Sequence, residues 1–505
     1  MCSAAKWSGT GLQFCYIPRK SSLPRYSMNS SNSQTVRWLA LGIVMVILLV
    51  VWARQMTGSA IEKDSAQLVR MAINLDRHGV ISLEEAPPYT PTDYREPIPV
   101  FASALAIKIM DGVLGAAPDD AYFSGTRAKY LKYQNLIWLP LLSAGAFWAA
   151  YVLTSSFFLG LLGLLLVNIP FAGGHFGADL VDGVFSDVPA AAFFMFACTA
   201  LAVGFAQRRL GYIALAGLLF GITTLVKAPV LYVFIGVILV LPCVFLLQRQ
   251  PLRAVLRDWL VLIVPFACVI TPWMYRNHVE LGSFQLSQRA GVVLMYRALK
   301  DQMTWLEYRG SFYVWGPGFL QKPLGRVLGF TPEDLRRGGR LQHLNTALDS
   351  DFAADDLAAE RAGRPDQTLT YYRQARAERT KIEMELDRAG NKQAELDGDD
   401  ILKTRAMNLI IEHPWRHLAL IIPFLWRGAT FVFPILVIVL AVAVRRRRYD
   451  LALFALPAFG LVVFFALFSH FIARYALPAR EVATVALVAL VALLLRPKTK
   501  SAFSG

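Results

Sequence analysis

The sequence predicts an all-α protein that crosses a membrane several times, and two observations lead to this fold class. Apolar residues make up 55% of the 505 residues, while charged residues make up only 17%. Soluble domains carry about 25% charged residues, so the chain is unlike a soluble globular domain. The apolar residues also occur in blocks of roughly 15–27, the length that a helix needs to cross a hydrocarbon core about 30 Å thick.

Ten apolar blocks can each form a spanning helix. In chain order they are 38–53, 135–153, 157–171, 188–206, 210–226, 228–247, 259–275, 418–444, 451–468 and 482–495. Residues 99–115 are also apolar, but Lys108 and Asp111 interrupt the block. We therefore predict that 99–115 forms an interfacial helix along the outer membrane surface, and that 311–330 does the same.

The charges of the connections predict the orientation. Five short segments together hold 17 Lys and Arg and no Asp or Glu, namely 1–37, 207–209, 249–257, 445–448 and 496–500. Positively charged loops face the cytoplasm, so these segments and both termini are predicted to be cytoplasmic. Segment 276–415 carries 20 Lys and Arg and 20 Asp and Glu, which suits a folded, mostly helical segment on the outer side.

This orientation divides the chain into five parts. They are a cytoplasmic tail (1–37), a transmembrane module (38–275) with a first outer loop (54–134), an outer-side segment (276–415), closing transmembrane helices (416–496) and a second cytoplasmic tail (497–505). We expect a cell (inner) membrane protein whose active site lies on the periplasmic or extracytoplasmic face.

Two classes of partner are not expected. The formal net charge of +15 reports loop orientation, because no aromatic and basic surface motif accompanies it, so nucleic acid is not a predicted partner. The two long hydrophilic segments contain no cysteine, which excludes a disulfide framework or a thiolate metal site there. The lipid bilayer is the partner that the composition requires.

Acidic residues gather near the outer membrane surface in two places. Glu62 and Asp64 follow the first span by about nine residues, and Arg95 and Glu96 precede the interfacial helix. The loop before the fourth span holds a second group: His175, Asp179, Asp182 and Asp187. Such a group could attract a divalent cation, but its spacing matches no metal motif, so no metal and no other cofactor is predicted.

Four cations lie on the outer side or within the membrane, where the orientation rule disfavours them. They are Lys227, Arg276, Arg427 and Arg474. Snorkelling could explain one or two of them, but four indicate an anionic partner such as a phosphate at headgroup level. Together with the outer acids they predict a reaction in which cations hold a lipid phosphate and a carboxylate accepts the proton of an attacking hydroxyl group.

Six motifs in a consistent order resemble polytopic glycosyltransferases of the GT-C type. The first outer loop carries Asp64, then Asn74-Leu75 and Gly79, then Arg95-Glu96-Pro97. The other five are SDVPAAAFF at 186–194, GLLFGITTLVKAP at 217–229, PWMYRNHVELGSF at 272–284, MNLIIEHPWRHLAL at 407–420 and ARYALPA at 473–479. The pattern is most similar to the group of dolichyl-phosphate-mannose–protein mannosyltransferases and aminoarabinose transferases (families 39 and 83).

The resemblance implies a concrete activity and a set of site residues. Such enzymes move a sugar from a polyprenyl-phosphate carrier to a hydroxyl group of a lipid, glycan or protein on the outer face, usually with inversion. Asp64 takes the position of the catalytic base, and Lys227, Arg276 and Arg474 are candidates for the donor phosphate. Six further residues are candidates for substrate binding: Glu62, Arg95, Glu96, Asp187, Asn277 and Tyr475.

Two other function classes remain open at this point. A transporter or flippase for a lipid-linked or small solute would also use charged residues near helix ends. The sequence shows no inverted repeat, however, and its acids gather on one face instead of the membrane midplane. A polymerase or ligase that acts on a diphosphate-linked glycan needs similar cations but gives no role to Asp64 with Arg95-Glu96-Pro97.

Overall fold

The computed structural model describes residues 31–172, 175–247, 251–391 and 393–495. Contacts divide the chain into two units after Val44. The described part of the first unit is the beginning of helix α1 (Ser31–Gln55), and the paragraphs that follow concern residues 45–495. Apart from residues 31–37, the predicted N-terminal tail lies outside the described residues, as does the predicted C-terminal tail.

Every regular element among the described residues is a helix, which confirms the predicted all-α class. Seven described helices are long and apolar enough to cross a membrane, or eight if one sharply bent pair counts as a span. Three predicted spans are shorter apolar helices: Phe157–Ala172, Leu210–Val226 and Val230–Cys243. The predicted number of ten spans is therefore approximate.

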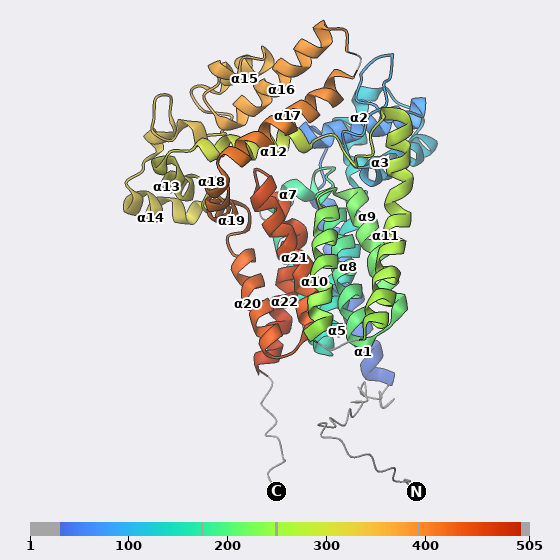
Figure 1. Cartoon of the computed structure of the whole chain (residues 1–505). Helices are drawn as coiled ribbons and strands as arrows, with labels where there is room; N and C mark the ends of the chain where they lie inside the picture. The colour runs from blue at the N-terminus through green and yellow to red at the C-terminus, as the bar shows by residue number, and fades with distance from the viewer. Residues whose placement is uncertain (1–30, 173–174, 248–250, 392, 496–505) are drawn as a thin grey trace, which may run out of the picture. The chain divides into compact units, whose positions relative to one another are not determined.

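The core of the helical bundle is α8 (Asp187–Gln207), the most buried of the candidate spans. It packs against four neighbours: α5 (Asn135–Thr154), α9 (Leu210–Val226), α21 (Tyr449–Phe468) and α22 (Leu477–Leu495). The helices α6 (Phe157–Asn168), α10 (Val230–Leu247), α11 (Leu252–Leu281) and α20 (Val432–Arg445) surround this centre (Figure 1).

Glycines explain how closely two of these helices approach. A Cβ atom on Gly217 of α9 would lie 2.0 Å from the carbonyl oxygen of Leu262 on α11. One turn later, a Cβ atom on Gly221 would lie 2.8 Å from Val269. The Gly-x-x-x-Gly spacing noted in the sequence is thus a helix-contact motif, since small residues allow backbones in a membrane to pack closely.

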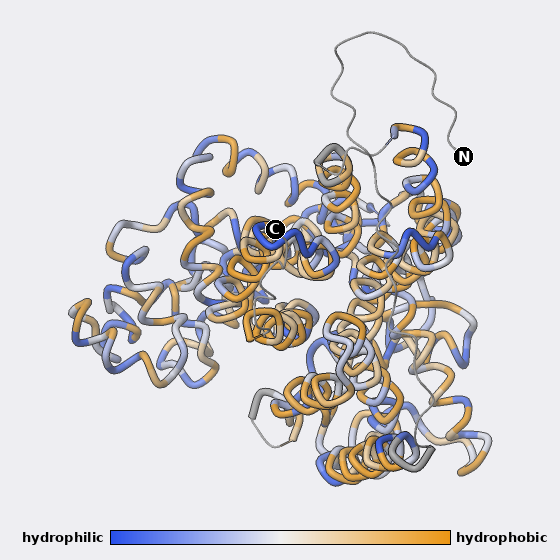
Figure 2. The backbone as a smooth tube through the Cα atoms, turned by 90° about the horizontal axis from the view of Figure 1, so that it is seen from below, coloured by the Kyte–Doolittle hydropathy of each residue, from blue (hydrophilic) through white to orange (hydrophobic). Residues whose placement is uncertain are grey.

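The outward faces of the bundle are apolar, as a membrane requires. Leu239, Leu260, Val264 and Ile438 are each more than half exposed. Figure 2, seen along the helices, shows hydrophobic residues over most of their length. Water would disfavour such surfaces, whereas lipid chains cover them without cost.

The predicted outer-side segment is a set of shorter helices at one end of the bundle (Figure 1). It contains α12 (Ala290–Ala298), α13 (Trp305–Val314), α14 (Gly318–Leu328), α15 (Ala353–Arg361), α16 (Tyr371–Arg388) and α17 (Ala394–Glu412). Helix α12 contacts α16 and α17 on one side and α21 on the other. The segment therefore meets the bundle through α12, and α13 contacts α19 (Ile421–Ala429) of the closing helices as well.

The first outer loop contributes helices at the same end of the bundle. They are α2 (Lys63–His78), α3 (Pro97–Leu114) and α4 (Gly125–Lys132). By length and composition α3 could also span a membrane. It packs mainly against α2, however, and its main contact with the bundle is with α9. Phe319 and Val327 on α14 are largely exposed. The interfacial position of both helices stays a prediction.

The prediction of one continuous span over 418–444 is wrong. Residues Pro414–Ala429, which contain α18 (Pro414–Ala419) and α19 (Ile421–Ala429), are bent by 103° from α20. Two contacts join α19 to the segment that follows α21, and these contacts hold α19 across the end of α21. Arg427 donates a hydrogen bond to the carbonyl oxygen of His470 (3.0 Å), and the ring of Phe471 fills the space above Gly428. Hydropathy along the chain does not report either contact.

The cationic run at 445–448 lies at the bundle end away from the outer-side segment (Figure 1). Arg448 donates a hydrogen bond to the carbonyl oxygen of Leu153 near the end of α5 (3.0 Å). The connection after α5 and the predicted cytoplasmic connection after α20 are thus at the same end of the bundle. Which end faces the cytoplasm stays a prediction.

Candidate active site

Asp64 is the second residue of α2, and the backbone before it has an unusual conformation. Lys63 has φ 54°, in the left-handed region that a residue with a side chain rarely adopts. Such strained residues occur at functional sites, where the surrounding contacts hold them in place.

The motif residues at the other end of α2 have structural roles. Gly79 ends the helix in the left-handed conformation (φ 71°), which glycine adopts without strain. The side-chain amide of Asn74 donates hydrogen bonds to the carbonyl oxygens of Ser82 and Glu84, both at 2.9 Å. Asn74 and Gly79 therefore fix the return of the chain toward Arg95.

The three residues Arg95-Glu96-Pro97 connect different parts of the site. Nη2 of Arg95 lies 2.6 Å from Oδ1 of Asp64 and also binds the side chain of Gln67. Oε1 of Glu96 accepts a hydrogen bond from the backbone N–H of Ala228 at 3.1 Å. Pro97 begins α3, where its missing N–H group costs nothing.

Asp187 connects two of the predicted cations. It begins α8 with its side chain almost fully buried, and Oδ1 forms an ion pair with Nζ of Lys227, the residue that ends α9. Oδ2 of Asp187 lies 3.4 Å from Nε of Arg474. Arg474 also reaches Asp64, with 2.5 Å between Nη2 and Oδ2. Lys227 and Arg474 therefore both lie against Asp187.

Arg289 is a site residue that the sequence analysis missed. It precedes α12, whose first backbone N–H groups are capped by the carboxylate of Asp399 on α17. Nη2 of Arg289 lies 3.8 Å from Oδ1 of Asp64, and its guanidinium group lies over the ring of Tyr94. Its position directly before an apolar helix in the outer-side segment was the only signal in the sequence.

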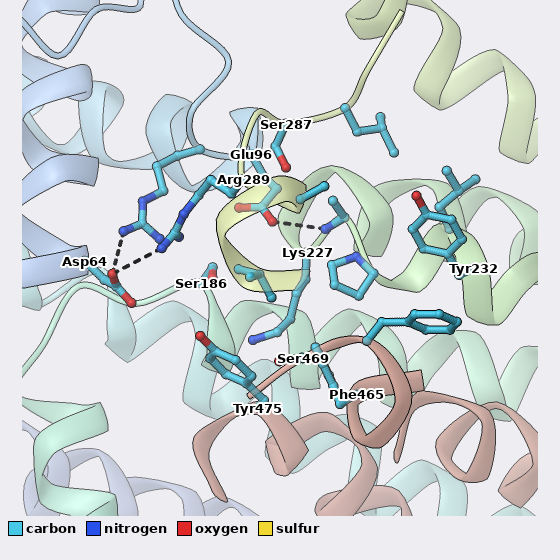
Figure 3. Close-up of a pocket in the computed structure, with 18 of the residues that line it drawn as sticks. Asp64, Glu96, Ser186, Lys227, Tyr232, Ser287, Arg289, Phe465, Ser469 and Tyr475 are labelled. Atoms are coloured by element: carbon cyan, nitrogen blue, oxygen red, sulfur yellow. Dashed lines mark hydrogen bonds and ion pairs between the residues drawn. The ribbon is translucent and has the colours of Figure 1, made fainter. Parts of the chain in front are cut away.

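One cavity of about 580 Å³ lies between the bundle and the short helices at one of its ends. Its lining includes Asp64, Arg95, Glu96, Asp187, Lys227, Arg289 and Arg474. Asp64, Arg289, Lys227 and Tyr475 lie toward one end, whereas Tyr232 and Phe465 lie toward the other (Figure 3). Around the second end, the ring of Tyr232 on α10 stacks on Phe464 of α21, which also contacts Phe465 and Phe468. Tyr232 and Phe468 are also well exposed.

The polar end has a surplus of positive charge. Five Lys and Arg side chains line the cavity, against three Asp and Glu side chains. Nε of Arg289 and Nε of Arg474 are buried and have no hydrogen-bond partner among the described residues. Buried donors without a partner are costly, so an anion at this end would satisfy them.

The same cations suppress the basicity of Asp64. Burial alone would raise the pKa of its carboxyl group, but the charges of Arg95, Arg289 and Arg474 together hold the pKa far below its usual range. In the structure without a substrate, Asp64 is therefore a strongly held carboxylate and a weak base.

Three predicted site residues do not line the cavity. Glu62 is exposed to solvent before α2. Arg276 donates hydrogen bonds to the carbonyl oxygen of Thr92 (3.2 Å) and to Asn277 (3.1 Å), and its guanidinium group lies over Trp273. Asn277 is fully buried and binds the carbonyl oxygen of Gln285. The structure does not bring Arg276 to the other two predicted phosphate ligands, because its face of α11 points away from them.

The acidic loop before α8 divides between two roles. Asp182 accepts hydrogen bonds from Lys132, Thr57 and Ser59, so it ties the loop to the first outer loop. Asp187 belongs to the cavity, and the side chain of His175 lies outside the described part. Within the described ranges, no group of three or more His, Cys, Asp or Glu could hold a metal ion.

Asp93, beside the cavity, gives a pH-dependent prediction. Burial raises the pKa of its carboxyl group to about 7, although Arg276 opposes this shift; Glu395 and Asp399 add to it. The folded state therefore binds the proton more tightly than the unfolded state, whose pKa is 3.8. This stability is complete below about pH 4 and is lost as the pH rises to about 7. We expect Asp93→Asn to raise the melting temperature of the detergent-solubilised protein more at pH 8 than at pH 5.

The exposed Asp120 of the same loop provides the matched control. Asp120→Asn should shift the two melting temperatures equally or leave both unchanged. If the melting temperature changes between pH 5 and pH 8 by the same amount in Asp93→Asn and in the wild type, the raised pKa of Asp93 is contradicted.

No known family model matches the sequence, and no curated protein matches it. Among solved structures, the crystal structure of ArnT from Cupriavidus metallidurans in the apo state is 13% identical, with a TM-score of 0.37. The alignment covers 91% of this chain and 78% of that chain. The crystal structure of ArnT from Cupriavidus metallidurans bound to undecaprenyl phosphate is 14% identical, with a TM-score of 0.34 over 92% of this chain and 78% of that chain.

Proposed function

We propose that this chain is a membrane glycosyltransferase that moves a sugar from a polyprenyl-phosphate carrier to a hydroxyl group on the outer face of the membrane. The observation that carries the proposal is the form of the cavity. One end gathers Arg289, Lys227 and Arg474, and the other end is apolar and includes the well-exposed side chains of Tyr232 and Phe468. A lipid phosphate has the same two parts, an anionic group and a hydrocarbon chain.

The chemistry follows from the groups at the polar end. The acceptor oxygen attacks C1 of the sugar, and the bond between C1 and the phosphate oxygen breaks with inversion. The bonding electrons leave with the polyprenyl phosphate, whose developing charge Lys227, Arg289 and Arg474 stabilise. The proton of the acceptor hydroxyl goes to the carboxylate of Asp64. The proposal includes no metal ion and no other cofactor.

The position of the charges favours transfer over transport. Apart from Lys403 in the middle of α17, the charged side chains that line the cavity come from helix ends and from the loops at the outer end of the bundle: Asp64, Arg95, Glu96, Asp187, Lys227, Arg289 and Arg474. A transporter places its substrate site near the midplane, between repeats. A site at headgroup level suits a reaction between a lipid donor and an acceptor outside the membrane.

The proposal can be tested with the full-length protein in lipid nanodiscs. Candidate polyprenyl-phosphate sugars are added together with a cell-envelope extract as the source of acceptor hydroxyl groups, and mass spectrometry follows the release of polyprenyl phosphate. Lys227→Met should weaken donor binding by about 1–3 kcal/mol, the usual value of a charge-assisted hydrogen bond. Arg257→Met is the matched control, because Arg257 pairs with its neighbour Asp258 and does not line the cavity.

The acceptor can be identified in cells. Lipids, glycans and proteins of the cell envelope are compared with and without the chain, and one class should lose a sugar. If no donor is consumed while a labelled lipid or solute crosses the membrane of proteoliposomes, the transporter class replaces this proposal.

A further inference from the structure

Two of the arginines at the polar end have two possible anionic partners. Without a ligand, Arg474 lies 2.5 Å from Asp64 and Arg289 lies 3.8 Å from it. Both guanidinium groups line the cavity; Nε of Arg289 has no hydrogen-bond acceptor among the described residues, and Nε of Arg474 has only its ion-pair contact with Asp187 at 3.4 Å. A phosphate that enters the cavity therefore meets cations that Asp64 already holds.

The two requirements of the proposed reaction conflict in this arrangement. A carboxylate that binds three guanidinium groups is a poor proton acceptor, because protonation would break favourable ion pairs. At the same time, arginines that are neutralised by a carboxylate attract a phosphate less strongly. The site cannot accept a proton well and bind the donor well while these pairs persist.

We propose that Arg289 and Arg474 exchange partners, binding Asp64 in the empty cavity and the donor phosphate in the occupied one. The inference rests on the proposed function. Donor binding then removes two cations from Asp64 and so activates its carboxylate only when a sugar donor is present. Arg95 stays with Asp64, because the side chain of Gln67 holds the same guanidinium nitrogen in place.

The exchange has an unexpected consequence for affinity, because Asp64 competes with the phosphate for the arginines. We expect Asp64→Asn to bind farnesyl phosphate, a short prenyl monophosphate, about tenfold more tightly than the wild type. The measurement is isothermal titration with the full-length protein in nanodiscs of a zwitterionic lipid. This readout needs no catalytic activity.

Glu96→Gln is the matched control for net charge. It removes one negative charge from the same cavity, but Glu96 accepts its hydrogen bond from a backbone N–H and has no ion pair among the described residues. We expect this variant to change the affinity by about threefold or less, as for a charge without a direct partner. Equal strengthening by both variants would show simple charge repulsion and overturn the exchange.

Other results separate the inference from the function on which it rests. Unchanged or weaker binding by Asp64→Asn, with wild-type binding intact, overturns the exchange alone. If neither the wild type nor any variant binds the prenyl phosphate or consumes a donor, the proposed function fails and the inference falls with it.

A second measurement uses only the wild type, in case Asp64→Asn does not fold. The pH dependence of kcat/KM reports the free protein, and that of kcat reports the donor complex. The exchange predicts that the acid limb of kcat lies at higher pH than that of kcat/KM; coincident limbs would contradict it. The titratable and charged groups that face Asp64 are Arg95, Asp187, Arg289, His470, Arg474 and Tyr475.

Discussion

Asp64→Asn is expected to reduce sugar transfer by about 10²–10⁴-fold, the usual contribution of a general base. Asparagine has nearly the same shape but accepts no proton at neutral pH. Turnover at saturating donor should therefore fall, while KM for the donor should fall as well if the arginines are released to the phosphate. The measurement is steady-state release of polyprenyl phosphate in nanodiscs, with melting temperature as the test of folding.

The neighbouring carboxylates are the controls for this prediction. Glu62→Gln should retain near-normal turnover, because Glu62 is exposed and does not line the cavity. Near-normal turnover by Asp64→Asn with an inactive Glu62→Gln would move the base to Glu62. If Glu96→Gln were the inactive variant instead, the base would be Glu96, the other carboxylate of the first outer loop that lines the cavity. Near-normal turnover by all three would remove the loop from the chemistry.

The class of fold could be predicted from the sequence because each helix that spans a membrane requires a long run of apolar residues. Helices such as α8 and α21 are long apolar runs, and hydropathy finds them without any tertiary information. The break between α19 and α20 escaped prediction, because it depends on contacts with residues about 43 positions away in the chain, such as that between Arg427 and His470. Local composition cannot report such a contact.

The site shows the same division. Lys227 and Arg474 were predicted from the charge pattern to lie on the outer side, and both line the cavity. The charge pattern selects Arg276 in the same way, but its side chain does not line the cavity. Charge predicts the side of the membrane on which a residue lies, but it does not predict which face of the helix the residue occupies when the end of the span is uncertain. Arg289 was missed because its approach to Asp64 joins residues from two loops that are far apart in the chain. Only the packing of α12 on α17 places it there.

Helix α12 is also held by a buried network around Arg297, near the end opposite Arg289. The side chain of Arg297 is fully buried. Nη1 donates to Asp301 (2.9 Å), Nε to the carbonyl oxygen of Ala466 (3.1 Å) and Nη2 to that of His417 (2.5 Å). The ring of His417 in turn contacts the other carboxylate oxygen of Asp301 (2.7 Å). The network joins α12 to the end of α21 and to α18.

We expect Arg297→Met to destabilise the protein by about 3–5 kcal/mol, because it leaves the buried carboxylate of Asp301 without its guanidinium partner. The double variant Arg297→Met/Asp301→Leu should cost less than the single one, since it leaves no buried charge unpaired. Arg405→Met, which breaks an exposed pair with Glu378, should change stability by about 1 kcal/mol or less. The measurement is thermal unfolding of the detergent-solubilised protein.

The same substitution should also impair the site at a distance. Arg289 lies at the other end of α12, and Arg474 follows the end of α21 to which Arg297 is bonded. A protein that still folds at low temperature should therefore bind prenyl phosphate more weakly, because the two arginines lose their fixed separation. A single variant as stable as the wild type, with unchanged binding, would show that α12 is held by its apolar contacts alone.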